Sequence, residues 1–299
     1  MSTMRFAALA LGSVLFSAAC SGAGGSPGGG SPGSGTPAPS SPPPGIEHAT
    51  GTTDVILRMA TGGGFVAPGF LATEAPEFTL YGDGTVVFRD PADQPPVAES
   101  DPVMRSAPFK TVRLSEAQIQ DLLAFAIGPS GLGIARAQYH PCCIADAPST
   151  MFTLRAGGLD KTVSVGALGF DELQPGPDTA ARKAFTALRD RLIDLDRGGL
   201  IAVERYRPAA YRGFLVDADA PAPGRGAIDW PWTAFGPDGF TVPADPNVFQ
   251  MGSRTLTAAD VAALGLANLE GGAQGIPLRG PDAQIRVLSL RPLLPDDTK

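Results

Sequence analysis

The chain has 299 residues, of which 43% are hydrophobic and 18% are charged, and its formal net charge at pH 7 is −7. A chain of this length and composition can bury a sizeable core, in one large domain or two small ones. The acidic balance argues against nucleic acid as a partner, because no cluster of arginine or lysine offsets the repulsion of a phosphate backbone.

The first nineteen residues have the pattern of an export signal. Arg5 gives a weakly positive start, and residues 6–16 are apolar but too few to span a bilayer as an anchor. Ser17 and two alanines, all with small side chains, then precede Cys20. We therefore expect residues 1–19 to form a signal peptide that is removed on export.

The residues around Cys20 resemble the lipobox of bacterial lipoproteins, in which the cysteine becomes the acylated first residue of the mature chain. They depart from that pattern at Ser17, where a leucine is usual. The resemblance implies a lipid anchor at Cys20 and a location outside the cytoplasm, on the cell membrane. The alternative is an ordinary signal cut after Ala19, which would give a freely secreted protein.

Residues 21–45 contain no large apolar side chain and consist mainly of Gly, Ser and Pro. Such a segment cannot bury enough surface to offset the entropy lost by ordering it. We predict that residues 20–49 form a lipid-anchored, disordered tether, more extended at its Pro-rich end. A spacer is useful when the residue before it is fixed to a surface, which favours lipid anchoring over secretion.

The first part of the folded body has the pattern of strands and hairpins. Residues 54–59 read as a strand, and residues 77–89 read as a hairpin that turns at Gly82-Asp83-Gly84. Residues 91–108 contain five prolines, which predicts a surface loop. A further strand is expected at residues 110–114.

Two helices and a second hairpin follow. Ser115 and Gln118 have the spacing of a capping box at the start of a helix that Gly128 ends. Residues 150–167 predict the hairpin, with a glycine pair at its turn. Asp178 is the expected N-cap of the second helix, and its charged residues, Arg182 among them, predict a solvent-exposed face.

The last third predicts strands at residues 200–206, 213–217 and 285–290 and a short helix at residues 257–264. Because short turns rather than helical crossovers join the strand pairs, we expect an α+β fold in which antiparallel β-hairpins pack against a few amphipathic helices. The predicted division is an α+β domain at residues 50–197 and a second α+β half or subdomain at residues 198–299.

Over the whole chain, the leader, Cys20, the spacer and the YGDGTV hairpin at residues 81–86 resemble the uncharacterised lipoproteins of bacteria with GC-rich genomes. The abundance of alanine, glycine, proline and arginine fits such a genome. This resemblance implies a location outside the cytoplasm, on the cell membrane. It implies no activity.

The segment from Tyr139 to Asp146 gathers one of the two histidines with both cysteines that follow Cys20. In an extended segment His140 and Cys142 point to the same side, so imidazole and thiolate could bind copper or zinc, with Cys143 or Asp146 as a further ligand. A disulfide between Cys142 and Cys143 would be strained, because adjacent Cα atoms are too close. The alternatives are buried, inert thiols or a Cys142/His140 catalytic dyad.

Two weaker features complete the candidates. Trp230 and Trp232 could form an aromatic platform for a sugar ring or a proline-rich peptide, although burial is the commoner fate of large aromatic residues. Asp217 begins an Asp-Ala-Asp triplet that lacks the remaining ligands of a calcium loop.

These patterns predict a non-catalytic envelope lipoprotein that binds an unknown ligand or partner at the cell surface and has no cofactor. The alternative is an extracytoplasmic metal-binding or thiol-redox protein centred on His140, Cys142 and Cys143. An extracytoplasmic hydrolase ranks third.

Overall fold

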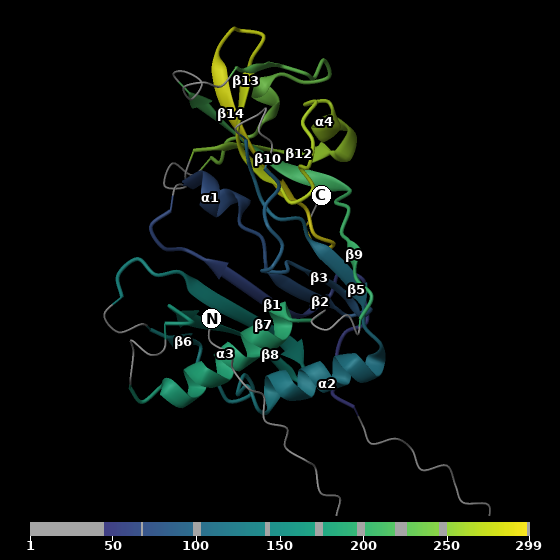
Figure 1. Ribbon diagram of the computed structural model, residues 1–299, viewed down its shortest axis with the longest axis vertical. Helices are drawn as coiled ribbons and strands as arrows, with labels where there is room; N and C mark the ends of the chain where they lie inside the picture. The colour runs from purple at the N-terminus through teal and green to yellow at the C-terminus, as the bar shows by residue number, and fades with distance from the viewer. Residues whose placement is uncertain are drawn as a thin grey trace, which may run out of the picture. The chain divides into compact units, whose positions relative to one another are not determined.

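The computed structural model describes the following ranges: residues 45–66, 68–97, 103–140, 144–170, 176–195, 201–218, 226–244 and 250–297. In these ranges the chain is rich in strands and has few helices, which is compatible with the predicted α+β class (Figure 1). Its contacts group Pro44–Lys299 into one compact unit.

The first sheet has eight strands within the described ranges. They are β1 (Val55–Gly62), β2 (Phe78–Tyr81), β3 (Thr85–Phe88), β5 (Lys110–Arg113), β6 (Gln138–Tyr139), β7 (Ser149–Ala156), β8 (Leu159–Gly166) and β9 (Glu204–Arg205). The order across the sheet is β6-β8-β7-β1-β2-β3-β5-β9. Neighbouring strands are antiparallel, except that β6 runs parallel to β8.

The two hairpins predicted from the alternating pattern are confirmed as β2–β3 and β7–β8. The first turns at Gly84, whose φ of 88° lies in the left-handed region that favours glycine. A Cβ atom at this position would lie 2.5 Å from the carbonyl oxygen of Leu114, so the residue must be glycine for a steric reason as well.

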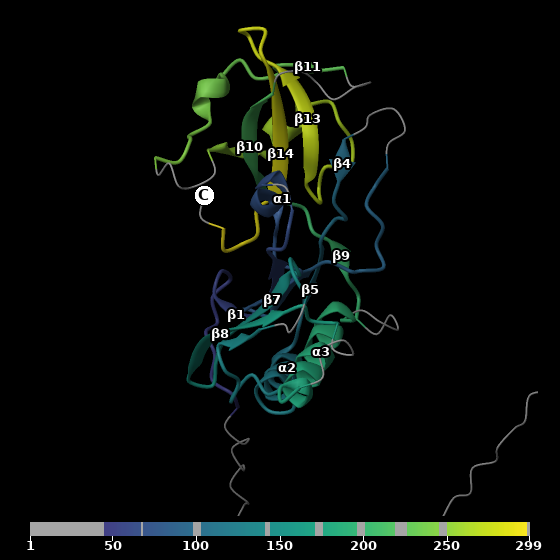
Figure 2. The same ribbon diagram turned by 90° about the vertical axis from the view of Figure 1, so that its left-hand side faces the viewer.

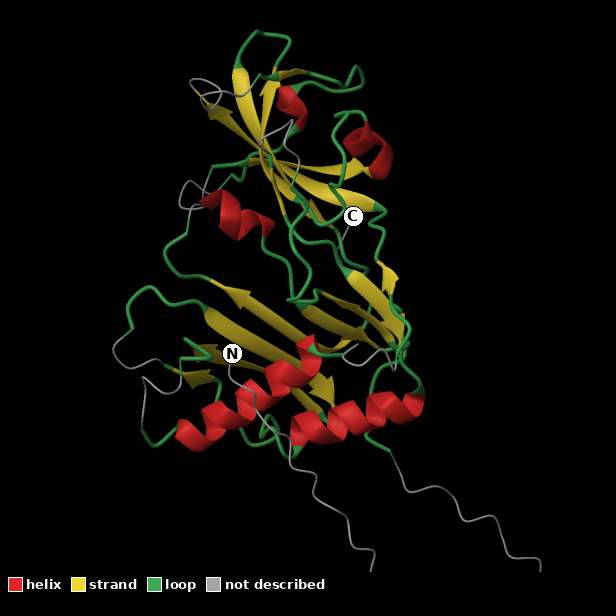
Figure 3. Cartoon of the chain, viewed as in Figure 1, coloured by secondary structure: helices red, strands yellow, loops and turns green. Residues whose placement is uncertain are grey.

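Two helices, α2 (Glu116–Ile127) and α3 (Thr179–Ile193), cover one face of this sheet (Figure 3). The predicted capping box of α2 is present, because Ser115 and Gln118 each accept a hydrogen bond from the other's backbone N–H. Asp178 precedes α3 but makes no capping hydrogen bond with its side chain. Its carboxylate instead accepts a hydrogen bond of 2.6 Å from Arg136.

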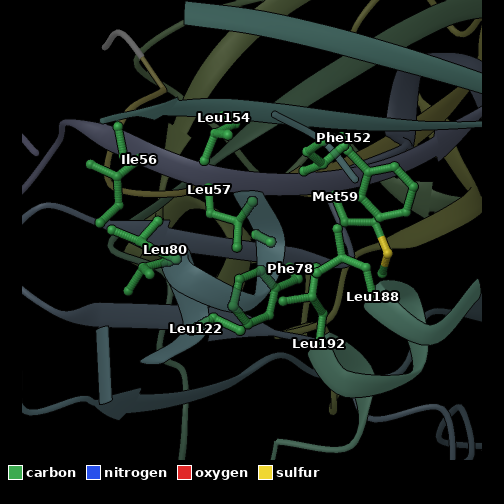
Figure 4. Close-up of a cluster of buried hydrophobic side chains, with 14 of the residues drawn as sticks. Ile56, Leu57, Met59, Phe78, Leu80, Leu122, Phe152, Leu154, Leu188 and Leu192 are labelled. Atoms are coloured by element: carbon green, nitrogen blue, oxygen red, sulfur yellow. The ribbon is translucent and has the colours of Figure 1, made fainter. Parts of the chain in front are cut away.

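The main core lies between this face of the sheet and the two helices. The alternating residues of β1 and β7 that point toward the helices include Met59 and Phe152, and they meet Leu122 of α2 and Leu188 of α3 (Figure 4). Phe152 also stacks on Phe185 of α3, with ring centroids 6.0 Å apart. Burial of these side chains is the main favourable term in the stability of the sheet.

The prediction that Arg182 lies on a solvent-exposed face of the second helix is wrong. Arg182 is only 3% exposed, and its guanidinium donates hydrogen bonds of 2.9 and 2.8 Å to the carbonyl oxygens of Gly166 and Ala167. Gly166 is the last residue of β8, and Ala167 directly follows it. The charged side chain therefore links α3 to the end of the sheet.

The second sheet contains five strands in the order β11-β13-β14-β10-β12, and a further strand, β4, pairs with β13. Their bounds are β4 (Met104–Arg105), β10 (Ala210–Ala218), β11 (Ile228–Asp229), β12 (Gly252–Thr257), β13 (Ala273–Arg279) and β14 (Ile285–Pro292). The helices nearby are α1 (Pro68–Thr73), α4 (Ala258–Ala262) and the 3-10 helix η2 (Pro237–Gly239).

A second core lies on one face of this sheet, and both tryptophans belong to it. Trp232 is buried and Trp230 is partly buried, with ring centroids 5.0 Å apart. The indole N–H of Trp230 donates to the backbone carbonyl of Phe235, and that of Trp232 donates to the carbonyl of Asp260. The pair is thus part of the hydrophobic core rather than an open aromatic platform.

Each sheet contains one short strand from the part of the chain that forms most of the other sheet. β4 comes from the proline-rich segment that the sequence predicts as a surface loop, yet it pairs with β13 through Met104 and Arg105. Conversely, β9 lies beyond residue 200 but pairs with β5 of the first sheet. The proposed division at residue 198 stays a prediction, and each sheet needs residues from both sides of it.

The folded part begins before residue 50. The backbone N–H of Ile46 donates to Gln120 of α2, and the Gln120 amide donates back to the Ile46 carbonyl at 2.9 Å. His48 forms an isolated bridge with Ala156. Within the range predicted as a tether, these residues therefore belong to the fold, while residues 20–44 lie outside the described residues.

The last described residues return to the first sheet and cover part of the face that α2 and α3 leave open. Leu294 is buried there against Val87 and Phe109. Asp296 accepts hydrogen bonds of 2.7 Å from both Arg58 and the hydroxyl of the fully buried Tyr81. Burial alone would raise the pKa of Asp296, but these two donors outweigh it and hold the pKa below its usual range.

Phe152→Ala should lower the free energy of unfolding by about 3–5 kcal/mol, because it leaves a cavity where strands and helices meet. Urea unfolding followed by circular dichroism measures this loss. Met151→Ala is the matched control, since Met151 is exposed on the opposite side of the same strand and should change stability by about 0.5 kcal/mol or less. Similar losses in the two variants would contradict this placement of the core.

Asp296→Asn should destabilise the protein by about 1–3 kcal/mol at neutral pH, because it weakens two hydrogen bonds to a charged group. The pKa of Asp296 is lower in the folded protein, so its stabilising effect is present at neutral pH and is lost as the pH falls through the folded pKa. The difference in stability between wild type and variant should therefore narrow below about pH 4.

Unfolding curves of Asp296→Asn at pH 7 and pH 3 test this dependence. Asp160→Asn serves as the control, because the Asp160–Arg155 pair is exposed and should contribute about 0.5 kcal/mol or less. An Asp296→Asn loss that stayed equal at both pH values would show that the charge of Asp296 does not hold the C-terminal segment.

Candidate functional site

The predicted metal-binding segment is only partly described. His140 is exposed and directly follows β6, so its imidazole is not a core side chain. Cys142 and Cys143 lie outside the described residues, as does Cys20. Asp146 is described and has a φ of 57°, in the left-handed region that few residues other than glycine adopt.

Within the described ranges, no three His, Cys, Asp or Glu side chains lie close enough together to hold a metal ion. This finding leaves out both cysteines of the predicted site. Binding of copper or zinc by His140, Cys142 and Cys143 therefore stays a prediction, as does a thiol-redox role.

A hollow of about 460 Å³ on the second sheet combines apolar and charged side chains. Its apolar walls include Leu215 of β10 and Phe240, and its polar groups include Asp217, Asp238 and Arg286. A neighbouring hollow of about 460 Å³ shares Asp217 and reaches the turn before β14. We call these two adjoining depressions the acidic hollow.

The register of β10 and β14 builds the floor of the acidic hollow. Asp217 lies directly opposite Arg286, and their side chains form an ion pair at 3.0 Å. Arg286 also donates two hydrogen bonds, of 2.9 and 2.8 Å, to the two carboxylate oxygens of Asp282, and one to Gln284. Arg286 is only 9% exposed, so four polar contacts hold a nearly buried cation in place.

The ion pair with Arg286 lowers the pKa of one carboxyl group beside the hollow. Hydrogen bonds from Arg286, together with its positive charge, lower the pKa of Asp282 to about 2. The side chain of Asp217 remains largely exposed, and Asp238 is also exposed. Two carboxylates, of Asp217 and Asp238, thus line the hollow beside one arginine that is already paired. The hollow therefore favours ligand groups that are cationic or donate hydrogen bonds.

A second hollow of about 320 Å³ lies between the proline-rich segment and the β5–β9 edge. Lys110 on its wall makes ion pairs with Asp90 at 2.6 Å and Asp93 at 3.4 Å. The hydrogen bond from Lys110 is the largest effect on Asp90 and lowers its pKa. These pairs tie the segment to the edge strand, so we assign them a structural role.

Glu77 and Arg89 are ionisable groups that sit largely within the protein. Burial raises the pKa of Glu77, although the backbone N–H of Thr61 donates to its carboxylate at 2.8 Å. Arg89 lies over the ring of Phe109, 4.2 Å from its centroid, and donates to the carbonyl of Gly271 in the second half of the chain. This arginine links the two sheets and lines none of the three depressions named above.

The described residues include no helix long and apolar enough to cross a bilayer. Comparisons with protein-family models, with curated proteins and with solved structures gave no match to this chain.

Sequence reasoning considered Asp217 only as the start of an incomplete calcium loop and did not single out Asp238, Asp282 or Arg286. The one available signal was a charged residue in the apolar strand predicted at residues 285–290, because a buried arginine needs carboxylate partners. The sequence does not show that Asp217, far away in the chain, supplies one of them.

Arg286→Gln should raise the pKa of Asp282 from about 2 toward the usual range, because the variant removes the cation and the paired hydrogen bonds. The ¹³C shift of the Asp282 carboxyl carbon, followed by NMR during an acid titration, measures this pKa. Arg279→Gln is the control: Arg279 pairs only loosely, at 3.5 Å, with Asp229, and its loss should leave Asp282 unchanged. An unchanged pKa in Arg286→Gln would refute the ion pair.

Proposed function

We propose that this protein is an extracytoplasmic lipoprotein, fixed to the cell membrane through Cys20, that binds a ligand or partner without catalysing a reaction. The order of features along the chain carries the proposal: an apolar leader, then Cys20, then a Gly/Ser/Pro spacer, then a fold that begins at Ile46. The leader would export the chain, Cys20 would anchor it, and the spacer would separate the anchored residue from the folded body.

The acidic hollow supports a binding role. Its floor is held by the Asp217–Arg286 ion pair between neighbouring strands and by the pair of Arg286 with Asp282 in the turn before β14, and its walls offer apolar contact next to exposed carboxylates. Binding sites commonly combine a concave apolar surface with a few fixed polar groups. We therefore propose the acidic hollow as the ligand site, for a ligand with a cationic or hydrogen-bond-donating group.

The second candidate function is metal binding or thiol-redox chemistry at His140, Cys142 and Cys143. The exposed position of His140 favours it, because an accessible imidazole is free to act as a ligand. Metal analysis and thiol titration of the purified protein decide between the two functions. One tightly held copper or zinc ion that Cys142→Ser removes would overturn the non-catalytic proposal.

Cys20→Ser should move most of the protein from the membrane fraction to the soluble fraction in the producing bacterium, because the acyl chains supply the stable anchor and contact of the body alone with lipid is weak and reversible. Mass spectrometry of the wild-type N-terminal peptide should show an acylated Cys20 as the first residue. Ser17→Leu, which restores the usual lipobox residue, should keep the protein in the membrane fraction. An N-terminal peptide that begins at Cys20 without acyl chains would refute the anchor and indicate secretion.

A further inference from the structure

Three loops meet at one end of the first sheet. In the strand register Gly62 pairs with Ser149, and Ser149 pairs with Gly166. The loop after β1, the segment before β7 and the loop after β8 therefore lie side by side. Figure 2 looks toward this end of the sheet, where β1, β7 and β8 lie below α1.

Exposed apolar side chains gather at this end. Among the described residues, ten large hydrophobic side chains are exposed, and six of them belong to these loops, to the start of β7 or to α1. We call these six the apolar end: Phe65, Val66, Phe70, Leu71, Met151 and Phe170. Phe65 is 91% exposed, so its ring has almost no contact with the rest of the protein. Such a concentration of exposed apolar surface is characteristic of a contact site.

The apolar side chains of this end stand in short stretches without charge, each bordered by a charged residue such as Glu74 or Asp146. Residues 60–73, 147–154 and 162–170 lack Asp, Glu, Lys and Arg altogether. Burial of these segments would remove no charge of their own from water, although Glu74 lies against Gly62 and Arg189 against Gly169 at their margin. Because the apolar residues stand on separate segments, they suit a broad fluid surface better than a single narrow groove.

The tether joins the body far from the apolar end. His48 bridges to Ala156, the last residue of β7, whereas the apolar end lies beyond Ser149, the first residue of that strand. A strand of this length spans about 26 Å. A chain anchored at Cys20 can thus bring the apolar end to the membrane only if the spacer extends past the body.

The spacer has the required length. Residues 21–45 reach about 80 Å when fully extended, and a flexible chain of this length has a root-mean-square span of about 28 Å. The relaxed span matches the length of the strand that separates the two ends. The anchor also keeps the body close to the bilayer, so that weak contacts with lipid suffice.

We propose that the apolar end inserts its side chains into the surface of the bilayer in which Cys20 is anchored, so that the body lies against the membrane. The inference rests on the lipid anchor proposed above. Peripheral membrane contact of this kind depends on the apolar area that enters the interface, and cations are needed only where the lipids are anionic. The partner is therefore a lipid surface with neutral headgroups.

The experiment uses the mature chain, residues 20–299, with Cys20→Ser, so that no acyl chain contributes to binding. Vesicles of phosphatidylcholine are titrated into the protein, and the bound fraction is measured by sedimentation. The double variant Phe65→Ser/Phe170→Ser should bind about tenfold more weakly or worse, because it removes two aromatic side chains from the interface.

Ile134→Ser is the matched control. Ile134 is 94% exposed, but it stands between two residues whose carbonyls accept hydrogen bonds from Lys161, near the start of β8 and away from the apolar end. This variant should bind vesicles as tightly as its parent does. Unchanged thermal unfolding in both variants would show that neither substitution disturbs the fold.

Absence of vesicle binding by the parent, or an equal loss in the Ile134→Ser control, would overturn the proposal. In the first case the apolar end would be a contact for another protein. The acylation test at Cys20 is independent: vesicle binding without acylation would overturn the proposed anchor alone, and acylation without vesicle binding would overturn the membrane contact alone.

Discussion

The return of the last residues to the first sheet is the contact on which the rest of the body depends. Two helices cover only one face of this sheet, and the other face carries Val87, Phe109 and the ring of Tyr81. Leu294 shields these side chains from water, while Asp296 accepts hydrogen bonds from Arg58 and from Tyr81. Since the same segment directly continues β14, it also fastens the second sheet to the first.

The parts of the fold that sequence could predict are those with local causes. The hairpin at Gly84 and the capping box at Ser115 depend on residues within a few positions of each other, and both were predicted. The strand β4 was missed, because two residues in a proline-rich segment become a strand only through pairing with β13. The burial of Arg182 was missed for the same reason, since its acceptors belong to the end of another strand.

The same distinction between local and long-range causes applies to the candidate sites. The prediction at Cys20 rests on adjacent residues, whereas the acidic hollow requires Asp217 to face Arg286 across two strands, and only the register gives that contact. The apolar end is likewise assembled from segments that are distant in sequence. In sequence Phe65 and Phe170 read as ordinary apolar residues, and the fold leaves them uncovered.

Because each sheet needs a strand from the other part of the chain, neither sheet is complete until most of the described residues have been synthesised. A chain that emerges from its N-terminus has made β1 to β8 before β9 is available, and the cover over Tyr81 arrives only with Leu294 and Asp296, after β14. Contacts between positions so far apart form slowly and leave unpaired edges exposed meanwhile. A nascent copy of this protein thus remains vulnerable to aggregation and proteolysis until the segment after β14 has been released.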